Sequence, residues 1–166
     1  GTQIRFYLWE YGVLMLVSII IPTYQEAENI AYLVRNVAEV LSAHKIAHEF
    51  LIVDDNSPDG TSQIARALAI NYPLRCLRSS SSERSLAQSV IEGLRHARGE
   101  LCVVMDADLS HPPAAIPSLL APLLNNSADL VVGSRYIWGG GIENWPWYRY
   151  ALSRVGVILT YGLTRM

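Results

Sequence analysis

Two aspartates one residue apart follow a hydrophobic stretch in the segment MDADLSHPP, residues 105–113. If Met105 ends a β-strand, Asp106 and Asp108 project from the same face of it, where like charges repel each other. A cation between them removes that repulsion. Mg²⁺ and Mn²⁺ favour oxygen ligands, and Mg²⁺ usually takes one or two carboxylates together with substrate phosphates and water. The pair therefore indicates a divalent cation shared with a diphosphate, although a solvated turn can have the same pattern.

Two other polar clusters follow apolar stretches in the same way. PTYQE, residues 22–26, follows an apolar run at 16–21, and DDNSPDG, residues 54–60, follows one at 50–53. Open α/β sheets bind their ligands outside the carboxyl ends of the strands. If the three apolar stretches are parallel strands of one sheet, we expect the three polar clusters to converge on one crevice.

The residues between these clusters alternate between a strand pattern and a helical pattern. We expect strands at residues 16–21, 50–53, 74–77, 101–105 and 130–132, and helices at about 26–41, 61–72, 86–97 and 114–124. Acidic residues are expected in the first turn of the helix from Glu26, and Thr61 is expected to cap the next helix. Strands that alternate with helices over such lengths favour an open, mostly parallel α/β sheet.

Three other enzyme classes fit the sequence less well. A dinucleotide-binding Rossmann fold and a P-loop both need glycines in the turn after the first strand. That turn is PTYQE, which has none. A phosphatase with an aspartyl nucleophile can also have an Asp-x-Asp pair at a strand end, but the SHPP that follows does not continue such a motif.

The composition favours one globular domain with nearly balanced charge. The chain has 166 residues, of which 51% are hydrophobic, and 13 basic residues against 15 acidic ones. This length favours a single domain, and the scattered basic residues argue against a nucleic acid partner. Cys76 and Cys102 lie in predicted strands without metal-ligand or redox spacing. We therefore expect buried free thiols, which suit a reducing compartment.

The first residues differ in character from the rest. Residues 1–14 look unlike the start of a domain, whereas Met15 followed by LVSIIIP does. We therefore expect residues 1–14 to be a non-native or disordered extension and the native chain to begin at Met15. The longest apolar run, residues 13–21, is much shorter than the roughly 20 residues that a membrane span needs.

Four segments in this order resemble family 2 glycosyltransferases with a GT-A fold: IIIPTYQEAENI, VDDNSPDGT, VMDADLSHPP and VVGSRYIWGGGIENWPWYRYALSR. Within that family they are most similar to dolichyl- or polyprenyl-phosphate mannosyltransferases. The resemblance implies an α/β fold of the GT-A type, a Rossmann-like and mostly parallel open sheet flanked by helices in three layers. It implies one catalytic domain over residues 15–166, truncated at its C-terminus, because relatives continue further.

The resemblance also assigns roles to residues by their positions in the motifs. The residues implied to bind the nucleotide sugar are Pro22, Tyr24, Glu26, Val53, Asp55, Asp106, Ala107 and Asp108. An aromatic ring can stack on a base and a carboxylate can accept from its ring N–H groups. Asp106, Asp108 and Ser110 are implied to hold the Mg²⁺ or Mn²⁺, with Ser110 standing where close relatives often have glutamine.

Two arginines complete the implied site. Arg135 and Arg149 match residues that bind the acceptor phosphate, which a guanidinium can do with two parallel hydrogen bonds. Asp106, Asp108 and Arg135 are the expected catalytic residues. The neighbouring Trp145 and Trp147 suit either contact with a lipid surface or packing within the protein.

The resemblance implies an inverting transfer of a sugar, expected to be mannose from GDP-mannose, to a polyprenyl or dolichyl phosphate. Such an enzyme works at the cytoplasmic face of a membrane, as a peripheral protein or through a membrane-anchoring subunit or a missing C-terminal segment. A phosphate acceptor is largely ionised near pH 7, so no general base is needed. Two alternatives remain open: a family 2 transferase with a UDP-sugar donor or a saccharide acceptor, and an inactive nucleotide-binding fragment.

Overall fold

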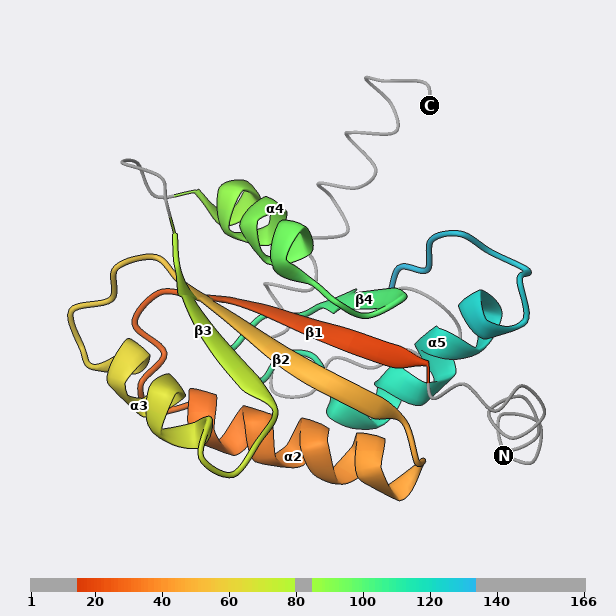
Figure 1. Ribbon diagram of the computed structural model, residues 1–166, viewed down its shortest axis with the longest axis horizontal. Coiled ribbons are helices and arrows are strands. Elements are labelled where there is room, and N and C mark those ends of the chain that lie inside the picture. Colours follow the sequence, from red (N-terminus) through yellow and green to blue (C-terminus); the bar gives the residue numbers. More distant parts are fainter. Residues whose placement is uncertain (1–14, 80–84, 134–166) are drawn as a thin grey trace, which may run out of the picture. The chain divides into compact units, whose positions relative to one another are not determined.

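The computed structural model describes residues 15–79 and 85–133 (Figure 1). The chain forms two compact units, Gly1–Val131 and Val132–Met166, and nearly all of the second lies outside the described residues. The expected N-terminal extension, Arg135, Arg149 and the two neighbouring tryptophans are outside them as well. The single domain expected over residues 15–166 stays a prediction.

The described part of the chain contains one sheet of four parallel strands. They are β1 (Leu16–Thr23), β2 (Ala47–Asp54), β3 (Leu74–Arg78) and β4 (Leu101–Val104), in the spatial order β3-β2-β1-β4. Thr23 of β1 lies opposite Asp54 of β2, and Ile20 of β1 lies opposite Val104 of β4. The carboxyl ends of β1, β2 and β4 are therefore neighbours at one edge, as the sequence predicts.

Helices cover both faces of this sheet, which gives three layers (Figure 1). On one face lie α2 (Ile30–Ala43), α3 (Thr61–Leu68) and α5 (Ile116–Leu124), the last preceded by the 3₁₀ turn η1 (Pro113–Ala115). On the other face lies α4 (Leu86–His96), which contacts β1 and β2. The predicted α/β architecture is confirmed.

The alternation of side chains along β1 divides the interior into two cores. Ile19 and Ile21 are fully buried in the larger core, on the side of α2, α3 and α5. Ile20 points to the other side, where it packs with Leu51 and Val53 in a smaller core. Because both faces of β1 are covered, its sequence reads as a continuous apolar run instead of an alternating one.

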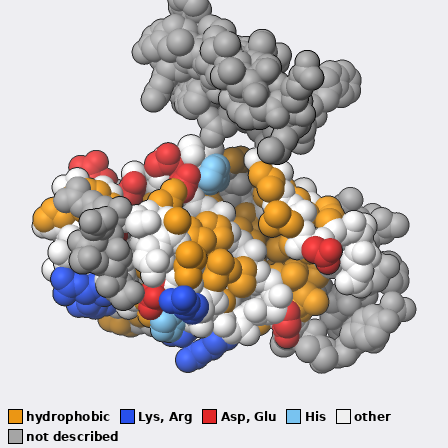
Figure 2. Space-filling model, turned by 90° about the horizontal axis from the view of Figure 1, so that it is seen from above, with side chains coloured by type: hydrophobic (Ala, Val, Ile, Leu, Met, Phe, Trp, Pro, Cys, Tyr) orange, Lys and Arg blue, Asp and Glu red, His pale blue; other side chains and the backbone are white. Residues whose placement is uncertain are grey.

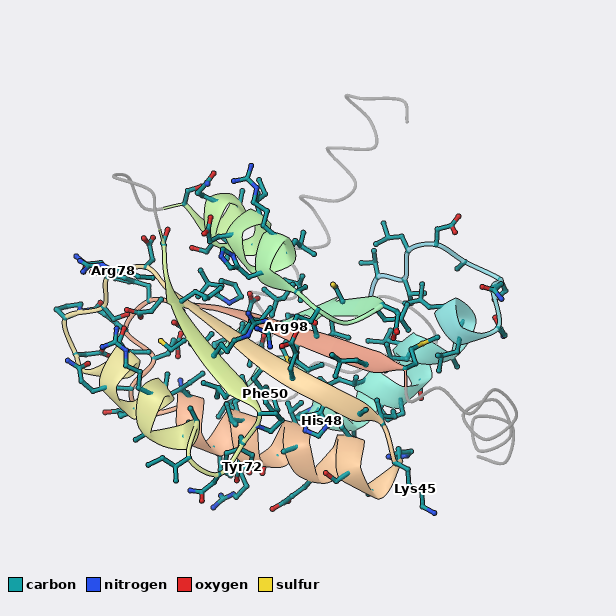
Figure 3. All side chains as sticks on the ribbon, in the orientation of Figure 1. Lys45, His48, Phe50, Tyr72, Arg78 and Arg98 are labelled. Atoms are coloured by element: carbon teal, nitrogen blue, oxygen red, sulfur yellow. The ribbon has the colours of Figure 1, made fainter. Side chains whose placement is uncertain are left out.

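A row of rings fills part of the larger core between β2 and the segment that precedes β3 (Figure 3). The ring of Phe50 lies between those of His48 and Tyr72, with centroid distances of 5.3 and 6.5 Å and nearly perpendicular planes. Edge-to-face contacts of this kind stabilise aromatic pairs beyond the area that they bury.

The face that carries α4 is less completely covered. The exposed large hydrophobic side chains include Leu86, Ile91 and Leu94 of α4 and Val104 of β4. Hydrophobic side chains gather on this side of the molecule in Figure 2. The larger core is thus well enclosed in the described part of the chain, whereas the smaller one is flanked by exposed apolar surface.

Two predictions about helix starts were wrong. α2 begins at Ile30 instead of Glu26 and has no acidic residue in its first turn. Residues 26–29 form a turn in which Glu26 O accepts from the N–H groups of Asn29 and Ile30. Thr61 is not a cap, because the N-cap of α3 is Gly60, whose φ of 91° is in the left-handed region that glycine readily adopts. Thr61 is buried and bonds to other loop residues instead.

Two other predictions were also wrong. Residues 130–132 are irregular, and Leu130 and Val132 are 80% and 76% exposed. A short apolar run becomes a strand only where a neighbouring strand pairs with it, and none does so among the described residues.

Both cysteines are free, as expected, but Cys102 is exposed and Cys76 is half-buried. Cys102 lies on the thinly covered face of β4, and partial burial raises the pKa of the Cys76 thiol.

A buried carboxylate ties the α4–β4 connection to the sheet. Glu49 Oε1 accepts from Ser18 Oγ at 2.7 Å and from the Arg98 N–H at 2.8 Å, and Oε2 lies 2.9 Å from the Arg75 guanidinium. The N–H of Gly99 donates to Ser18 Oγ at 2.9 Å. Burial alone raises the pKa of Glu49, but the hydrogen bonds from Ser18 and Arg98 and the charge of Arg75 together hold it below its usual value. Arg98 lies over the sheet in Figure 3.

We expect Glu49→Gln to lower the free energy of unfolding by about 1–3 kcal/mol at pH 7, because it leaves buried donors without a full partner. The pKa of Glu49 is lowered on folding. Its ionised form therefore stabilises the fold above the unfolded pKa of about 4.3, and this contribution is lost as the pH falls through the folded pKa. Urea unfolding from pH 7 to pH 3 should show that the stability difference between Glu49→Gln and the wild type shrinks in acid.

The matched control Glu39→Gln, on the exposed face of α2, should keep its free energy of unfolding within about 0.5 kcal/mol of the wild type. A deficit that persists unchanged at pH 3 would contradict this account.

Candidate functional site at the carboxyl edge of the sheet

The loops that follow β1 and β2 are joined by hydrogen bonds from three consecutive backbone N–H groups. The bonds run from Gln25 to Ser57 Oγ at 3.0 Å, from Glu26 to Thr61 Oγ1 at 3.0 Å and from Ala27 to Asp59 Oδ2 at 3.1 Å. Each loop also holds one residue other than glycine in the left-handed region, Gln25 and Asn56, both with φ of 58°. Side chains of one loop thus satisfy the backbone of the other, so the two loops form one structure.

Asp54, at the end of β2, anchors this pair of loops from within. Its carboxylate is 2% exposed. It accepts hydrogen bonds from the hydroxyls of Thr23, Ser57 and Ser62 at 3.3, 2.5 and 2.6 Å, and from the Ser57 N–H at 3.1 Å. Asp55, the next residue, is partly exposed and donates its N–H to Thr23 O at 2.9 Å. Of the two adjacent aspartates, the first is buried and structural, and the second is partly exposed.

The other residues expected to bind the nucleotide on these two loops also divide into partly exposed and buried ones. Tyr24 and Glu26 are partly exposed in the loop after β1, and Glu26 Oε2 accepts from Asn29 Nδ2 at 2.8 Å. Pro22 and Val53 are buried, paired with each other across the β1–β2 register. Val53 packs its side chain in the smaller core, so it can support a ligand only from beneath.

The acidic turn continues the alternation of β4 beyond the end of the strand. The Met105 N–H donates to Ile20 O at 3.1 Å, which extends the ladder with β1. Met105 and Ala107 are buried in the larger core, at 4% and 3% exposed. The Asp106 side chain is 50% exposed and Asp108 is exposed. The apolar side chains thus point inward, and the two carboxylates alternate with them, as the sequence predicts.

The turn after Asp108 is tightly held. Leu109 has a φ of 62°, which is uncommon for a residue other than glycine. Ser110 donates its N–H to Asp108 Oδ1 at 2.9 Å. Partial burial raises the pKa of Asp108, but the hydrogen bonds from the Ser110 N–H and hydroxyl outweigh it and hold the pKa below its usual value. Asp108 is therefore ionised at neutral pH.

His111 closes the turn onto Asp106. Its Nδ1 accepts the Asp106 N–H at 3.3 Å, and its Nε2 lies 3.9 Å from Asp106 Oδ2. Arg78, at the carboxyl end of β3, donates to Asn56 Oδ1 and so brings a guanidinium to the same edge of the sheet (Figure 3). Arg78 was not among the expected site residues, although it follows the predicted strand at 74–77 as the other polar clusters follow theirs.

The donor atoms of the acidic turn fit a hard divalent cation. In the part of the chain that the structure describes, no three His, Cys, Asp or Glu side chains come together as a metal site. Asp106 and Asp108 offer carboxylate oxygens on an accessible side, and Ser110 adds a hydroxyl beside Asp108. A six-coordinate Mg²⁺ or Mn²⁺ held there would complete its shell with water or phosphate oxygens.

The family follows from the sequence profile that the chain matches. Residues 18–163 match the profile described as glycosyl transferase family 2. The chain belongs to this family. It is 43% identical over 145 residues to a dolichol-phosphate mannosyltransferase of Pyrococcus furiosus, a match that covers 87% of this chain and 40% of that protein. It is 39% identical over 153 residues to a dolichol-phosphate mannosyltransferase of Mycosarcoma maydis, which covers 89% of this chain and 51% of that protein. The chain thus spans about half or less of the length of these relatives.

Solved structures support the fold. Mannosyl-3-phosphoglycerate synthase from Rubrobacter xylanophilus has a TM-score of 0.62 at 20% identity, covering 73% of this chain and 39% of that one. Glucosyl-3-phosphoglycerate synthase from Mycobacterium tuberculosis, solved with Mn²⁺, UDP and phosphoglyceric acid, has a TM-score of 0.58 at 18% identity, covering 74% of this chain and 42% of that one. The predicted GT-A type fold is confirmed. None of the helices within residues 15–79 and 85–133 has both the length and the apolar character to cross a membrane.

The neighbouring aspartates give a matched test of the anchor. We expect Asp54→Ala to lower the free energy of unfolding by about 1–3 kcal/mol, because it leaves the buried Thr23 hydroxyl and the half-buried Ser57 and Ser62 hydroxyls without their acceptor. Asp55→Ala should change it by less than about 0.5 kcal/mol, because that side chain is partly exposed. Urea titration followed by circular dichroism measures both. Equal losses in the two variants would show that the anchor is assigned to the wrong residue.

Proposed function

We propose that the chain is the donor-binding and catalytic part of an inverting glycosyltransferase that transfers mannose from GDP-mannose to the phosphate of dolichol or another polyprenol. The observation that carries the proposal is the meeting of three polar loops at one edge of the sheet, with Asp106 and Asp108 on its accessible side. The 43% identity to a protein named dolichol-phosphate mannosyltransferase supports the choice of sugar and acceptor.

The nucleoside binds to the joined loops after β1 and β2. Tyr24 offers a ring on which a base can stack, and Asp55 offers a carboxylate that can accept from base N–H groups. Glu26 is held in the same loop by Asn29, while Pro22 and Val53 form the floor under it. The hydrogen bonds between the loops fix these side chains before the donor arrives, which reduces the entropy lost on binding.

The diphosphate binds at the acidic turn. Asp106, Asp108 and Ser110 hold Mg²⁺ or Mn²⁺, and Ala107 contributes the backbone between the two carboxylates. The bound cation supplies positive charge that stabilises the departing diphosphate. A related fold has been solved with Mn²⁺ and UDP, which supports a divalent cation beside a nucleotide in this architecture.

The acceptor needs no general base from the protein. Its phosphate is largely ionised near pH 7, since the second pKa is about 6. One of its oxygens attacks the anomeric carbon from the side opposite the diphosphate, the bond to the diphosphate breaks, and GDP leaves with the electron pair. Arg135 and Arg149 orient the acceptor phosphate, and Arg135 also stabilises the charge that develops during transfer.

The lipid acceptor puts the reaction at a membrane surface. We propose a peripheral location at the cytoplasmic face, where the nucleotide sugar and the lipid phosphate meet. Attachment is through a membrane-anchoring subunit, a further segment of the protein or the residues around Trp145 and Trp147. The relatives extend well beyond the matched region, which leaves room for such a segment in them.

Calorimetry with GDP, UDP and MnCl₂ tests the donor and the metal together. We expect GDP to bind at least about tenfold more tightly with Mn²⁺ than in EDTA, because a cation held by Asp108 would offset the negative charge of the diphosphate. Asp108→Asn should abolish that gain, because it removes the charge from the cation's ligand. Asp129→Asn, an exposed aspartate after α5, is the matched control and should keep the gain.

The outcomes separate the proposed function from its alternatives. A preference for UDP contradicts GDP-mannose as donor, and equal binding of GDP with and without Mn²⁺ contradicts the metal site. Transfer of radiolabelled mannose from GDP-mannose to dolichyl phosphate is the test of catalysis. Metal-dependent GDP binding without transfer would identify this chain as a nucleotide-binding fragment that needs the rest of the protein.

A further inference from the structure

We propose that His111 is a positioning residue: through the hydrogen bond from the Asp106 N–H to its Nδ1, it sets the orientation of Asp106 for the cation and the diphosphate. The inference rests on the proposed function, because the cation and nucleotide are its ligands. It concerns a residue outside the expected ligands Asp106, Asp108 and Ser110.

The hydrogen bond from Asp106 to His111 lies immediately after the last backbone hydrogen bond to β1. Met105 is the last residue whose N–H donates to β1. The next N–H, that of Asp106, donates at 3.3 Å to the His111 side chain, which comes from the far end of the turn. The imidazole therefore accepts the Asp106 N–H in place of a backbone carbonyl of a neighbouring strand. Asp106 is also the residue whose carboxylate must be oriented.

The same bond occupies one of the two ring nitrogens. A nitrogen that accepts an N–H does so with its lone pair, so Nδ1 of His111 is not free for a metal. Nε2 lies 3.9 Å from Asp106 Oδ2, which is longer than a hydrogen bond. The contribution of Nδ1 is to hold Asp106 and not to join the cation's ligands.

The backbone on both sides of His111 is restricted. Leu109 holds a φ of 62°, and His111 precedes Pro112, which disfavours helical backbone at His111. Pro113 then begins η1, which leads directly into α5. The first residue of α5, Ile116, is buried in the larger core. The ring is thus carried by a short, stiff segment that is anchored in the core, although its own side chain is 44% exposed.

Three substitutions separate this role from simple packing of the turn. The Oδ1 atom of asparagine lies about as far from Cα as Nδ1 of histidine and can accept the same N–H, whereas the amide of glutamine reaches only the position of Nε2. We therefore expect His111→Asn to retain the positioning, and His111→Gln and His111→Ala to lose it. His44→Ala, at an exposed histidine after α2, is the control.

The first measurement is Mn²⁺ affinity in the presence of GDP, by electron paramagnetic resonance titration of the full chain. Loss of groups that orient metal ligands typically weakens metal binding by about 10 to 100 fold, so we expect about a tenfold higher Kd in His111→Ala and His111→Gln. His111→Asn should stay within about threefold of the wild type, and GDP binding in EDTA should not change in any variant. Wild-type Mn²⁺ affinity in His111→Ala overturns the inference. The inference is also overturned if Mn²⁺ affinity falls in all three His111 variants in proportion to their loss of unfolding free energy.

The second measurement needs no metal. Amide hydrogen exchange should show the Asp106 N–H protected in the wild type and in His111→Asn, and exchanging at least about tenfold faster in the other two variants. Equal exchange in all four proteins overturns the inference. If the wild type binds no Mn²⁺ with GDP, the proposed function fails and the metal role of His111 fails with it. If the wild type binds normally and His111→Ala does too, only the inference fails.

Discussion

The pairing of β1 with β2 on one side and β4 on the other is the constraint on which the site depends. β1 lies between these two strands, so its register with each neighbour decides which loops are brought together. Thr23 lies opposite Asp54, and Met105 continues the pairing with β1 by donating to Ile20 O. The polar residues that follow each strand are therefore level with one another, although Tyr24 and Asp106 are 82 positions apart in the sequence. A parallel sheet covered on both faces imposes this arrangement on loops of very different length.

Loops at such an edge carry backbone groups that a strand no longer satisfies, and this chain satisfies them with short polar side chains. Asp54, Ser57 and Asp59 each accept backbone or hydroxyl hydrogens from the loops around them. Each such bond contributes on the order of 1 kcal/mol net, but leaving its buried partner unsatisfied costs about as much or more. The two loops therefore stabilise each other. Their stability leaves Tyr24 and Asp55 at the surface in a defined position.

The sequence predicts the strands well because buried parallel strands are continuous apolar runs, which few other elements resemble. It places the beginning of β1 and both ends of the helix now seen as α5 to within two residues. It fails where tertiary contacts decide the outcome. Thr61 has the sequence features of a helix cap, but it is buried and hydrogen-bonded to Asp59 and to the loop after β1. The strand predicted at 130–132 has the right residue types without a partner in the described residues, and nothing in the local pattern distinguishes these cases. Within the site, the sequence predicts the accessible pair Asp106 and Asp108, whereas the residue pattern alone does not distinguish Asp54 from Asp55, and only the resemblance to the family selects Asp55.

Alternation of side chains at the end of β4 separates the residues that anchor the acidic turn from the residues that stay accessible. Ala107 lies between the two outward carboxylates, 3% exposed in the larger core with Met105. A small apolar residue at this position allows the turn to be held from below by hydrophobic burial, which does not depend on a ligand. The turn that carries Asp106 and Asp108 is therefore held by the core and by its own hydrogen bonds. Asp108 accepts the Ser110 N–H, and the Asp106 N–H donates to His111, so the backbone that carries both carboxylates is tied within the turn. The same apolar packing that stabilises the end of β4 therefore leaves the carboxylates of Asp106 and Asp108 accessible at this edge of the sheet.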